Sequence, residues 1–214
     1  MRGWIGLALG LTLLAGCTPE PAGLRPQPAA VAVPRPGGLT AYQQCLGDLD
    51  DLGIDFQLVP AVTNVQGCGI TDGVTVASEG VVLNRPTALS CELAVAFANF
   101  EFEWIEPLAH RYLKQGVTRA YHAGTYACRD IRGTAKGLSE HAHGRAIDLT
   151  GFDLTDGTVI NVGRDWAGPG PKSQFLHALV KRACERFDVV LTPRPRRLPP
   201  RPSASRSQRQ EFCG

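Results

Sequence analysis

The chain has 214 residues, of which 43% are hydrophobic and 20% charged, and its formal net charge is +2. This length fits one domain with attached segments, and the composition excludes a wholly disordered protein. Six of the 22 basic residues, but only one of the 20 acidic residues, lie from Arg194 onward, so the body of the chain is slightly acidic. Such a body lacks the basic surface of a nucleic-acid-binding domain, and we expect no nucleic-acid partner.

The N-terminus has the pattern of an export signal. Arg2 precedes an apolar stretch, residues 4–15, that is too short to span a membrane as a mature helix. The stretch ends in small residues before Cys17, which resembles a bacterial lipobox and predicts a signal peptide over residues 1–16 with lipidation of Cys17. Acyl chains would hold the protein on a membrane. By resemblance to sorted lipoproteins, Thr18 in place of Asp implies the periplasmic face of the outer membrane if the envelope is Gram-negative. A plain secretory signal cleaved nearby is the alternative.

The remaining chain predicts a tether followed by one domain. Residues 17–38 are rich in Pro, Ala and Gly, which indicates an extended tether. In chain order, the first expected elements are a helix capped by Thr40, strands over residues 73–76 and 81–83, and a helix capped by Ser90 with a kink or restart at Pro107. A strand over residues 119–123 and a hairpin of residues 146–152 and 158–163, which turns at Asp156-Gly157, should follow. The last expected elements are a helix capped by Ser173 and a strand over residues 189–191. Because regular β-α-β alternation is absent from this pattern, we expect one α+β domain over residues 39–193, with a small antiparallel sheet and flanking helices.

Cysteine usage agrees with export, because disulfides form in oxidising compartments. No C-x-x-C pair occurs, which argues against a zinc ribbon, and the connectivity stays open because six cysteines allow many pairings. Buried free thiols are the alternative. The disulfide candidates in the body of the chain are Cys45, Cys68, Cys91, Cys128 and Cys184, while Cys213 lies in the tail.

The segment 139–148 reads S-x-H-x-x-G-x-A-x-D and is the strongest sign of chemistry in the chain. His141 and Asp148 are both zinc-ligand residue types, and Gly144 between them lets the backbone pass close to a site. Apolar alternation around Asp148 predicts that this residue lies on a strand. A histidine from a loop and a carboxylate from the adjoining strand would then meet at one cation.

Several segments resemble the bacterial extensin-like protein C-terminal domain family over roughly residues 40–192. They are Tyr126–Arg129, Leu138–Asp148, Gly151-Phe152, Asp165-Trp166 and Ala183–Phe187. The segment 139–148 also resembles the zinc DD- and LD-peptidases that cut peptidoglycan stem peptides, including the D-Ala-D-Ala dipeptidases. The resemblance implies the zinc DD-peptidase fold, a zinc cofactor and peptidoglycan stem peptides as partners.

By position, the resemblance implies that His141 and Asp148 are zinc ligands and that Arg129 faces a substrate carbonyl or carboxylate. A fixed guanidinium suits both developing oxyanion charge and a terminal carboxylate. A water activated by the metal would be the nucleophile. Ser139 and Gly144 would shape the loop. The alternatives are a solvated loop histidine at 141, a turn-capping role for Asp148 and a surface ion pair for Arg129.

The chain departs from this pattern at its C-terminal end. The family carries H-x-H on a last strand after a Val-Leu-x-Pro stretch, and this motif supplies the third ligand. Here the stretch is present at residues 190–193, but no histidine follows His177. A catalytic zinc usually has three protein ligands. His143 is a weak third candidate, because a residue two positions from His141 shares its side only in an extended segment. The remaining histidines, His110, His122 and His177, are predicted to be structural.

Residues 194–214 change abruptly to Arg, Pro and Ser, which indicates either out-of-frame translation of GC-rich DNA or a natural disordered tail. We expect this segment to pack on nothing. Two classes of function remain. The first is a zinc peptidase acting on peptidoglycan peptides, or an impaired relic of one. The second is a non-catalytic cell-wall module that holds a peptide carboxylate through Arg129.

Overall fold

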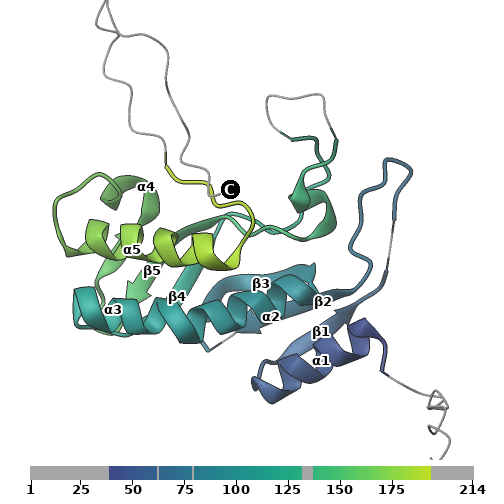
Figure 1. Cartoon of the computed structure of the whole chain (residues 1–214), viewed down its shortest axis with the longest axis horizontal. Helices are drawn as coiled ribbons and strands as arrows, with labels where there is room; N and C mark the ends of the chain where they lie inside the picture. The colour runs from purple at the N-terminus through teal and green to yellow at the C-terminus, as the bar shows by residue number, and fades with distance from the viewer. Residues whose placement is uncertain (1–38, 62, 79, 132–136, 194–214) are drawn as a thin grey trace, which may run out of the picture. The chain divides into compact units, whose positions relative to one another are not determined.

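The computed structural model describes residues 39–61, 63–78, 80–131 and 137–193 (Figure 1). The expectations for the signal peptide, the tether and the tail from residue 194 lie outside the described residues. Within the described ranges, no helix is both long enough and apolar enough to cross a membrane.

In the described ranges, six strands form one sheet in the order of the chain. They are β1 (Phe56–Val59), β2 (Gly73–Ser78), β3 (Val82–Ser90), β4 (Val117–His122), β5 (Leu149–Leu154) and β6 (Val159–Asn161). Neighbours are antiparallel except β3 and β4, which are parallel. The α+β class is confirmed, but the sheet is mixed and not antiparallel. The helical segment between β3 and β4 crosses over the sheet and returns the chain in the same direction, which a hairpin cannot do.

The helices begin where side chains can cap them. Thr40 and Gln43 form a capping box at the start of α1, and the Ser90 hydroxyl accepts a hydrogen bond from the backbone N–H of Leu93 in α2. The restart at Pro107 is confirmed, because this residue lies in the first turn of α3. The helical elements are α1 (Ala41–Asp51), α2 (Cys91–Phe100), the π-helix η1 (Glu101–Ile105), α3 (Glu106–Leu113), the 3-10 helix η2 (Glu140–His143), α4 (Val162–Asp165) and α5 (Pro171–Arg186).

The helices and the sheet enclose one apolar core. In Figure 1 the helices α2, α3 and α5 lie in front of the strands, and α2 contacts both β2 and β3. Phe152 of β5 and Phe175 of α5 are fully buried and meet edge to face, with ring centroids 5.6 Å apart. On the other side of the sheet, the Tyr121 hydroxyl donates to the Asp153 carboxylate at 2.8 Å. One apolar face and one polar face produce the two-layer arrangement expected of this class.

Disulfides link segments that are distant in the sequence, as the cysteine usage predicts. Cys45 of α1 bonds to Cys91 at the start of α2, and Cys68 bonds to Cys128 in the loop after β4. Cys184 of α5 is also disulfide-bonded.

Two expectations about the C-terminal part of the domain are wrong. Ser173 does not cap α5, which begins at Pro171 with Gly170 as its N-cap. Proline suits this first helical position because it lacks a backbone N–H, and an N–H at this position would have no partner within the helix. The Ser173 hydroxyl instead donates a hydrogen bond to the Trp166 carbonyl at 2.7 Å. Residues 189–191 form no strand, because no strand of the described part pairs with them.

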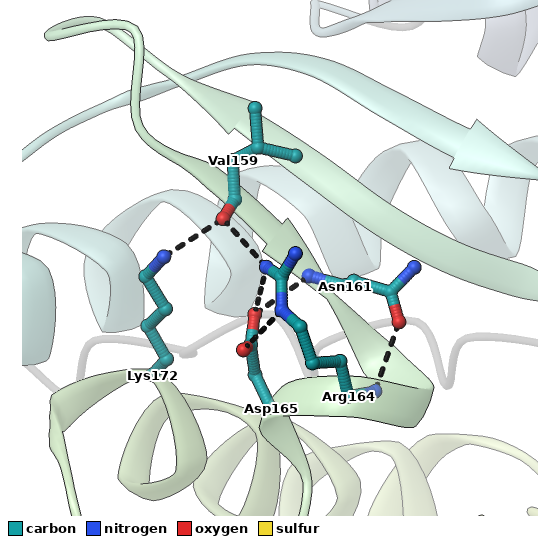
Figure 2. A network of polar contacts seen from close by, with 5 residues as sticks. All are labelled: Val159, Asn161, Arg164, Asp165 and Lys172. Atoms are coloured by element: carbon teal, nitrogen blue, oxygen red, sulfur yellow. Dashed lines mark hydrogen bonds and ion pairs between the residues drawn. The ribbon is translucent and has the colours of Figure 1, made fainter.

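The outer edge of the sheet at β6 is closed by side chains (Figure 2). The Val159 carbonyl accepts hydrogen bonds from Arg164 and Lys172, and the backbone N–H of Asn161 donates to the Asp165 carboxylate. Arg164 also donates two hydrogen bonds to Asp165 and is the main reason that the pKa of this carboxyl falls to about 2. These contacts satisfy the backbone groups that an edge strand would otherwise offer to another chain.

Candidate metal site

The candidate site is built where the chain leaves β4 and returns as β5. The segment after β4 runs back alongside the segment that carries the motif histidine. The backbone N–H of Ala127 donates to the His141 carbonyl, and that of Ser139 donates to the Arg129 carbonyl, both at 3.0 Å. These two bonds place the backbone of Arg129 beside the start of the motif.

The motif itself forms the 3-10 helix η2, which is held at both ends. At its start, the Ser139 hydroxyl accepts a hydrogen bond from the backbone N–H of His141 at 3.4 Å. At its end, Gly144 has φ +64°, and a Cβ atom there would lie 2.6 Å from the Cδ1 atom of Ile70. Only glycine fits this left-handed and crowded position. The Ser90 N–H donates to the Gly144 carbonyl at 2.9 Å, which ties the loop to the N-terminus of α2.

The side chains of His141 and Asp148 meet, although the two residues lie at opposite ends of the motif. The Nε2 atom of His141 lies 3.4 Å from the Oδ1 atom of Asp148. The histidine side chain is 10% exposed, whereas the aspartate side chain is 57% exposed, so the pair opens to solvent on the aspartate side. Asp148 precedes β5, which begins at Leu149, so the prediction that Asp148 lies on a strand is wrong. Backbone hydrogen bonds to Ala123 and Gly124 nevertheless hold it beside the extension of β4.

The second ring nitrogen of His141 is fixed by a backbone group. Nδ1 lies 3.2 Å from the carbonyl oxygen of Thr125, which can only accept a hydrogen bond. A hydrogen bond between these atoms requires a proton on Nδ1, and a neutral ring of that tautomer presents the Nε2 lone pair toward the Asp148 carboxylate, whereas an imidazolium ring would donate from both nitrogens. The neutral ring has the arrangement in which histidine binds metals, because a hydrogen bond at one ring nitrogen orients the other.

The pair fits a tetrahedral cation. Two ligand atoms each about 2.1 Å from a tetrahedral zinc lie about 3.4 Å apart. The observed separation between His141 Nε2 and Asp148 Oδ1 is 3.4 Å. A protonated imidazole in an ion pair with the carboxylate would occupy the same space, so the geometry fits zinc and also fits a simple ion pair.

A third ligand is not found in the described part of the chain. No group of three or more His, Cys, Asp and Glu side chains there could hold a metal ion. His143 follows His141 by two residues in a 3-10 helix, where each residue turns about 120° around the axis, so the two side chains leave on different sides. Arg129 does not contact the pair; its Nη1 atom donates to the Asp130 carbonyl at 3.4 Å.

An ion pair flanks the motif. The Nε atom of Arg145 donates to the Glu140 carboxylate at 2.6 Å, and this bond is the main cause of the lowered pKa of Glu140. The carboxylate therefore stays ionised next to the candidate site, where the Arg145 guanidinium balances its negative charge.

The other histidines take part in contacts away from the pair. His122 is buried, with Nε2 3.3 Å from the Arg85 carbonyl, and burial lowers its pKa. His177 stacks on Trp166 with ring centroids 4.1 Å apart, and His110 lies 3.6 Å from the Glu106 carboxylate.

Thr125 is the part of this site that the sequence did not predict. It contributes a backbone carbonyl, which every residue has, so no sequence signal marks it.

The profile of the family described as "Extensin-like protein C-terminus" matches residues 43–197. A search of curated proteins finds no match, and neither does a search of solved structures. The matched range contains every element from α2 to α5 and the whole His141–Asp148 motif. The chain therefore belongs to the extensin-like protein C-terminus family.

Proposed function

We propose that this domain is of zinc-peptidase type, that it acts on peptidoglycan stem peptides or derives from enzymes that do, and that His141 and Asp148 hold its metal. The observation that carries the proposal is the 3.4 Å separation of His141 Nε2 and Asp148 Oδ1, with Nδ1 held by the Thr125 carbonyl. A free lone pair and a carboxylate that face each other at this spacing favour a cation between them.

The residues of this chain have separate roles in that proposal. His141, kept in one tautomer, would bind the metal from the buried side, and Asp148 would bind it from the solvent side. Arg129, placed by its backbone bond to Ser139, would face the carboxylate or carbonyl of a peptide. Zinc, when bound, would supply a Lewis acid for peptide hydrolysis.

The same observations support a second function. Since no third ligand lies among the described residues, we expect zinc to bind weakly and hydrolysis to be impaired. A non-catalytic module that holds a peptide carboxylate needs a cation or Arg129, but it needs no complete catalytic site. Both of these proposed functions would be carried out at the cell wall.

Zinc titration of the purified, oxidised chain tests the proposal. Wild type should bind one zinc weakly, His141→Ala and Asp148→Ala should abolish this binding, and His143→Ala should leave it unchanged. His110→Ala is the matched control, because it removes an exposed histidine elsewhere. If wild type binds zinc at nanomolar affinity and cleaves muropeptides, the impaired-site proposal fails and His143 becomes the leading third ligand. If His141→Ala changes neither zinc binding nor binding to cell-wall fragments, the motif is only structural.

We also propose that the protein is a lipoprotein of the cell envelope. The support is the lipobox-like pattern before Cys17 and the Pro-rich segment that separates it from the domain. Labelled palmitate should enter the wild-type protein during expression in a bacterial host, and Cys17→Ala should lose the label. Label retained in Cys17→Ala would exclude lipidation at this residue.

A further inference from the structure

The candidate metal site lies beside a seam in the sheet. Strands β3 and β4 pair only at Val82 with Arg119 and at Leu83 with Ala120. β3 continues to Ser90, but backbone pairing with the extension of β4 does not continue. The backbone pairing therefore stops toward the end where the chain passes from β4 into the metal-site loop.

Side chains bridge this seam in place of backbone hydrogen bonds. The Asn84 side-chain oxygen accepts from the His122 N–H at 3.0 Å, and Arg85 donates to the Ala123 carbonyl at 2.5 Å. The position of the segment after His122 therefore depends on side chains of β3, and a substitution in β3 can move it.

The last bridge leads directly to His141. The Thr125 hydroxyl donates a hydrogen bond to the Ala88 carbonyl at 2.7 Å. The hydroxyl has a single proton, so it has none left to donate elsewhere. At the 2.5 Å contact between the hydroxyls of Thr87 and Thr125, Thr87 must therefore be the donor. The Thr125 carbonyl in turn accepts from His141 Nδ1. The residues Thr87 (9% exposed), Thr125 (3%) and His141 (8%) are all buried, so water does not replace these bonds.

We propose that Thr87 is a positioning residue for His141, acting across the seam through Thr125. It holds the Thr125 carbonyl where it fixes the Nδ1–H tautomer, so that Nε2 faces Asp148. The metal-affinity part of this inference rests on the proposed function, but the tautomer of His141 in the metal-free protein does not.

The effect of removing the Thr87 hydroxyl follows from the distances. In Thr87→Val a methyl group replaces the donor, and carbon atoms make non-bonded contacts at about 3.5 Å, not 2.5 Å. Thr125 must therefore shift by about 1 Å, and its hydroxyl loses the hydrogen bond that it accepts. Thr87→Ser keeps the donor and should keep the wild-type arrangement.

The experiment uses the full chain in two measurements. The first is ¹⁵N NMR of the His141 ring in metal-free protein over a series of rising pH values, compared where the spectrum is that of a neutral imidazole. Wild type and Thr87→Ser should show the Nδ1–H tautomer, and Thr87→Val should show a mixture of both tautomers. The second is zinc affinity, measured by competition with a chromophoric chelator. Thr87→Val should bind zinc about 10-fold more weakly than wild type, as for other residues that orient metal ligands.

Thr118→Val is the matched control, because Thr118 is a β4 threonine whose hydroxyl also donates to a backbone carbonyl, that of Asp153 at 3.3 Å. It should change neither measurement. If Thr87→Val does not fold, Thr87→Ala takes its place: it removes the donor without the clash and should still give a mixture of tautomers, because the Thr125 hydroxyl loses the hydrogen bond that it accepts. A Thr87 variant that lacks the donor and keeps the wild-type ring spectrum would overturn the inference. If wild-type protein binds no zinc, the proposed function fails and the ring spectrum alone decides the role of Thr87.

Discussion

The buried carboxyl group of Glu101 makes the stability of the domain depend on pH. Glu101 opens the π-helix η1, is 1% exposed and accepts a hydrogen bond from the Val81 N–H at 2.5 Å. Its second oxygen, Oε2, is buried with no hydrogen-bond partner. Burial raises the pKa of Glu101 to about 8, with a further contribution from the negative charge of Glu106, while the Val81 N–H acts in the opposite direction.

The size and sign of the effect follow from linkage. The unfolded chain releases this proton near the ordinary pKa of 4.5, whereas the folded chain keeps it up to about 8. The stabilisation is therefore complete below pH 4.5 and is lost as the pH rises to about 8. The difference between the two pKa values corresponds to a loss of up to about 5 kcal/mol, and to about 3 kcal/mol at neutral pH.

Glu101→Gln tests this reasoning, because glutamine keeps an acceptor for Val81 and cannot ionise. Urea unfolding should give the variant and wild type similar stabilities near pH 4.5. The variant should then become progressively more stable than wild type as the pH rises to about 8. Glu103→Gln is the control, since Glu103 is exposed on the same π-helix and should change stability little at any pH. Parallel pH profiles for Glu101→Gln and wild type would refute the account of Glu101.

Three further outcomes are expected. Gly144→Ala should lower the unfolding temperature and weaken zinc binding, because the added Cβ meets neighbouring atoms at 2.6 Å and the residue has φ +64°; unchanged values would refute the crowding. Asp165→Asn should destabilise the domain at neutral pH. The difference in stability between the variant and wild type should shrink as the pH falls from 3.8, the ordinary pKa of aspartate, to about 2, where the carboxylate held by Arg164 becomes protonated. Thermal unfolding measured against pH tests this, and a stability difference that stays constant with pH would contradict it. Replacing both Cys68 and Cys128 with alanine opens a loop of 60 residues and should cost about 4 kcal/mol of unfolding free energy in a urea titration; a loss below 1 kcal/mol would exclude the entropic account.

Local signals in the sequence predicted local structure well. The capping residues Thr40 and Ser90 begin the helices expected of them, since a cap bonds only to its own first turn. The turn at Asp156-Gly157 likewise joins β5 and β6, with Gly157 at φ +80°. The prediction that Ser173 caps a helix is wrong because Pro171, two residues earlier, is an equally local signal for a helix start and takes the first position of α5.

Features that depend on distant partners were not predictable. Residues 189–191 have the composition of a strand, but a strand forms only beside another strand, and the sequence does not show that none of the described strands pairs with these residues. The parallel pairing of β3 with β4 depends on a crossover of the whole helical segment. In the candidate site, the motif named His141 and Asp148, whereas Thr87 and Thr125 reach the histidine only through tertiary contacts.

Zinc-edge anomalous diffraction from crystals soaked in zinc tests the central claim most directly. We predict one anomalous peak between His141 Nε2 and Asp148 Oδ1, about 2.0–2.2 Å from each atom, with solvent completing its coordination. The peak should be absent from crystals of His141→Ala. A map with no peak at the pair, or with zinc bound only to other residues, would contradict the claim and leave the two side chains as an ion pair.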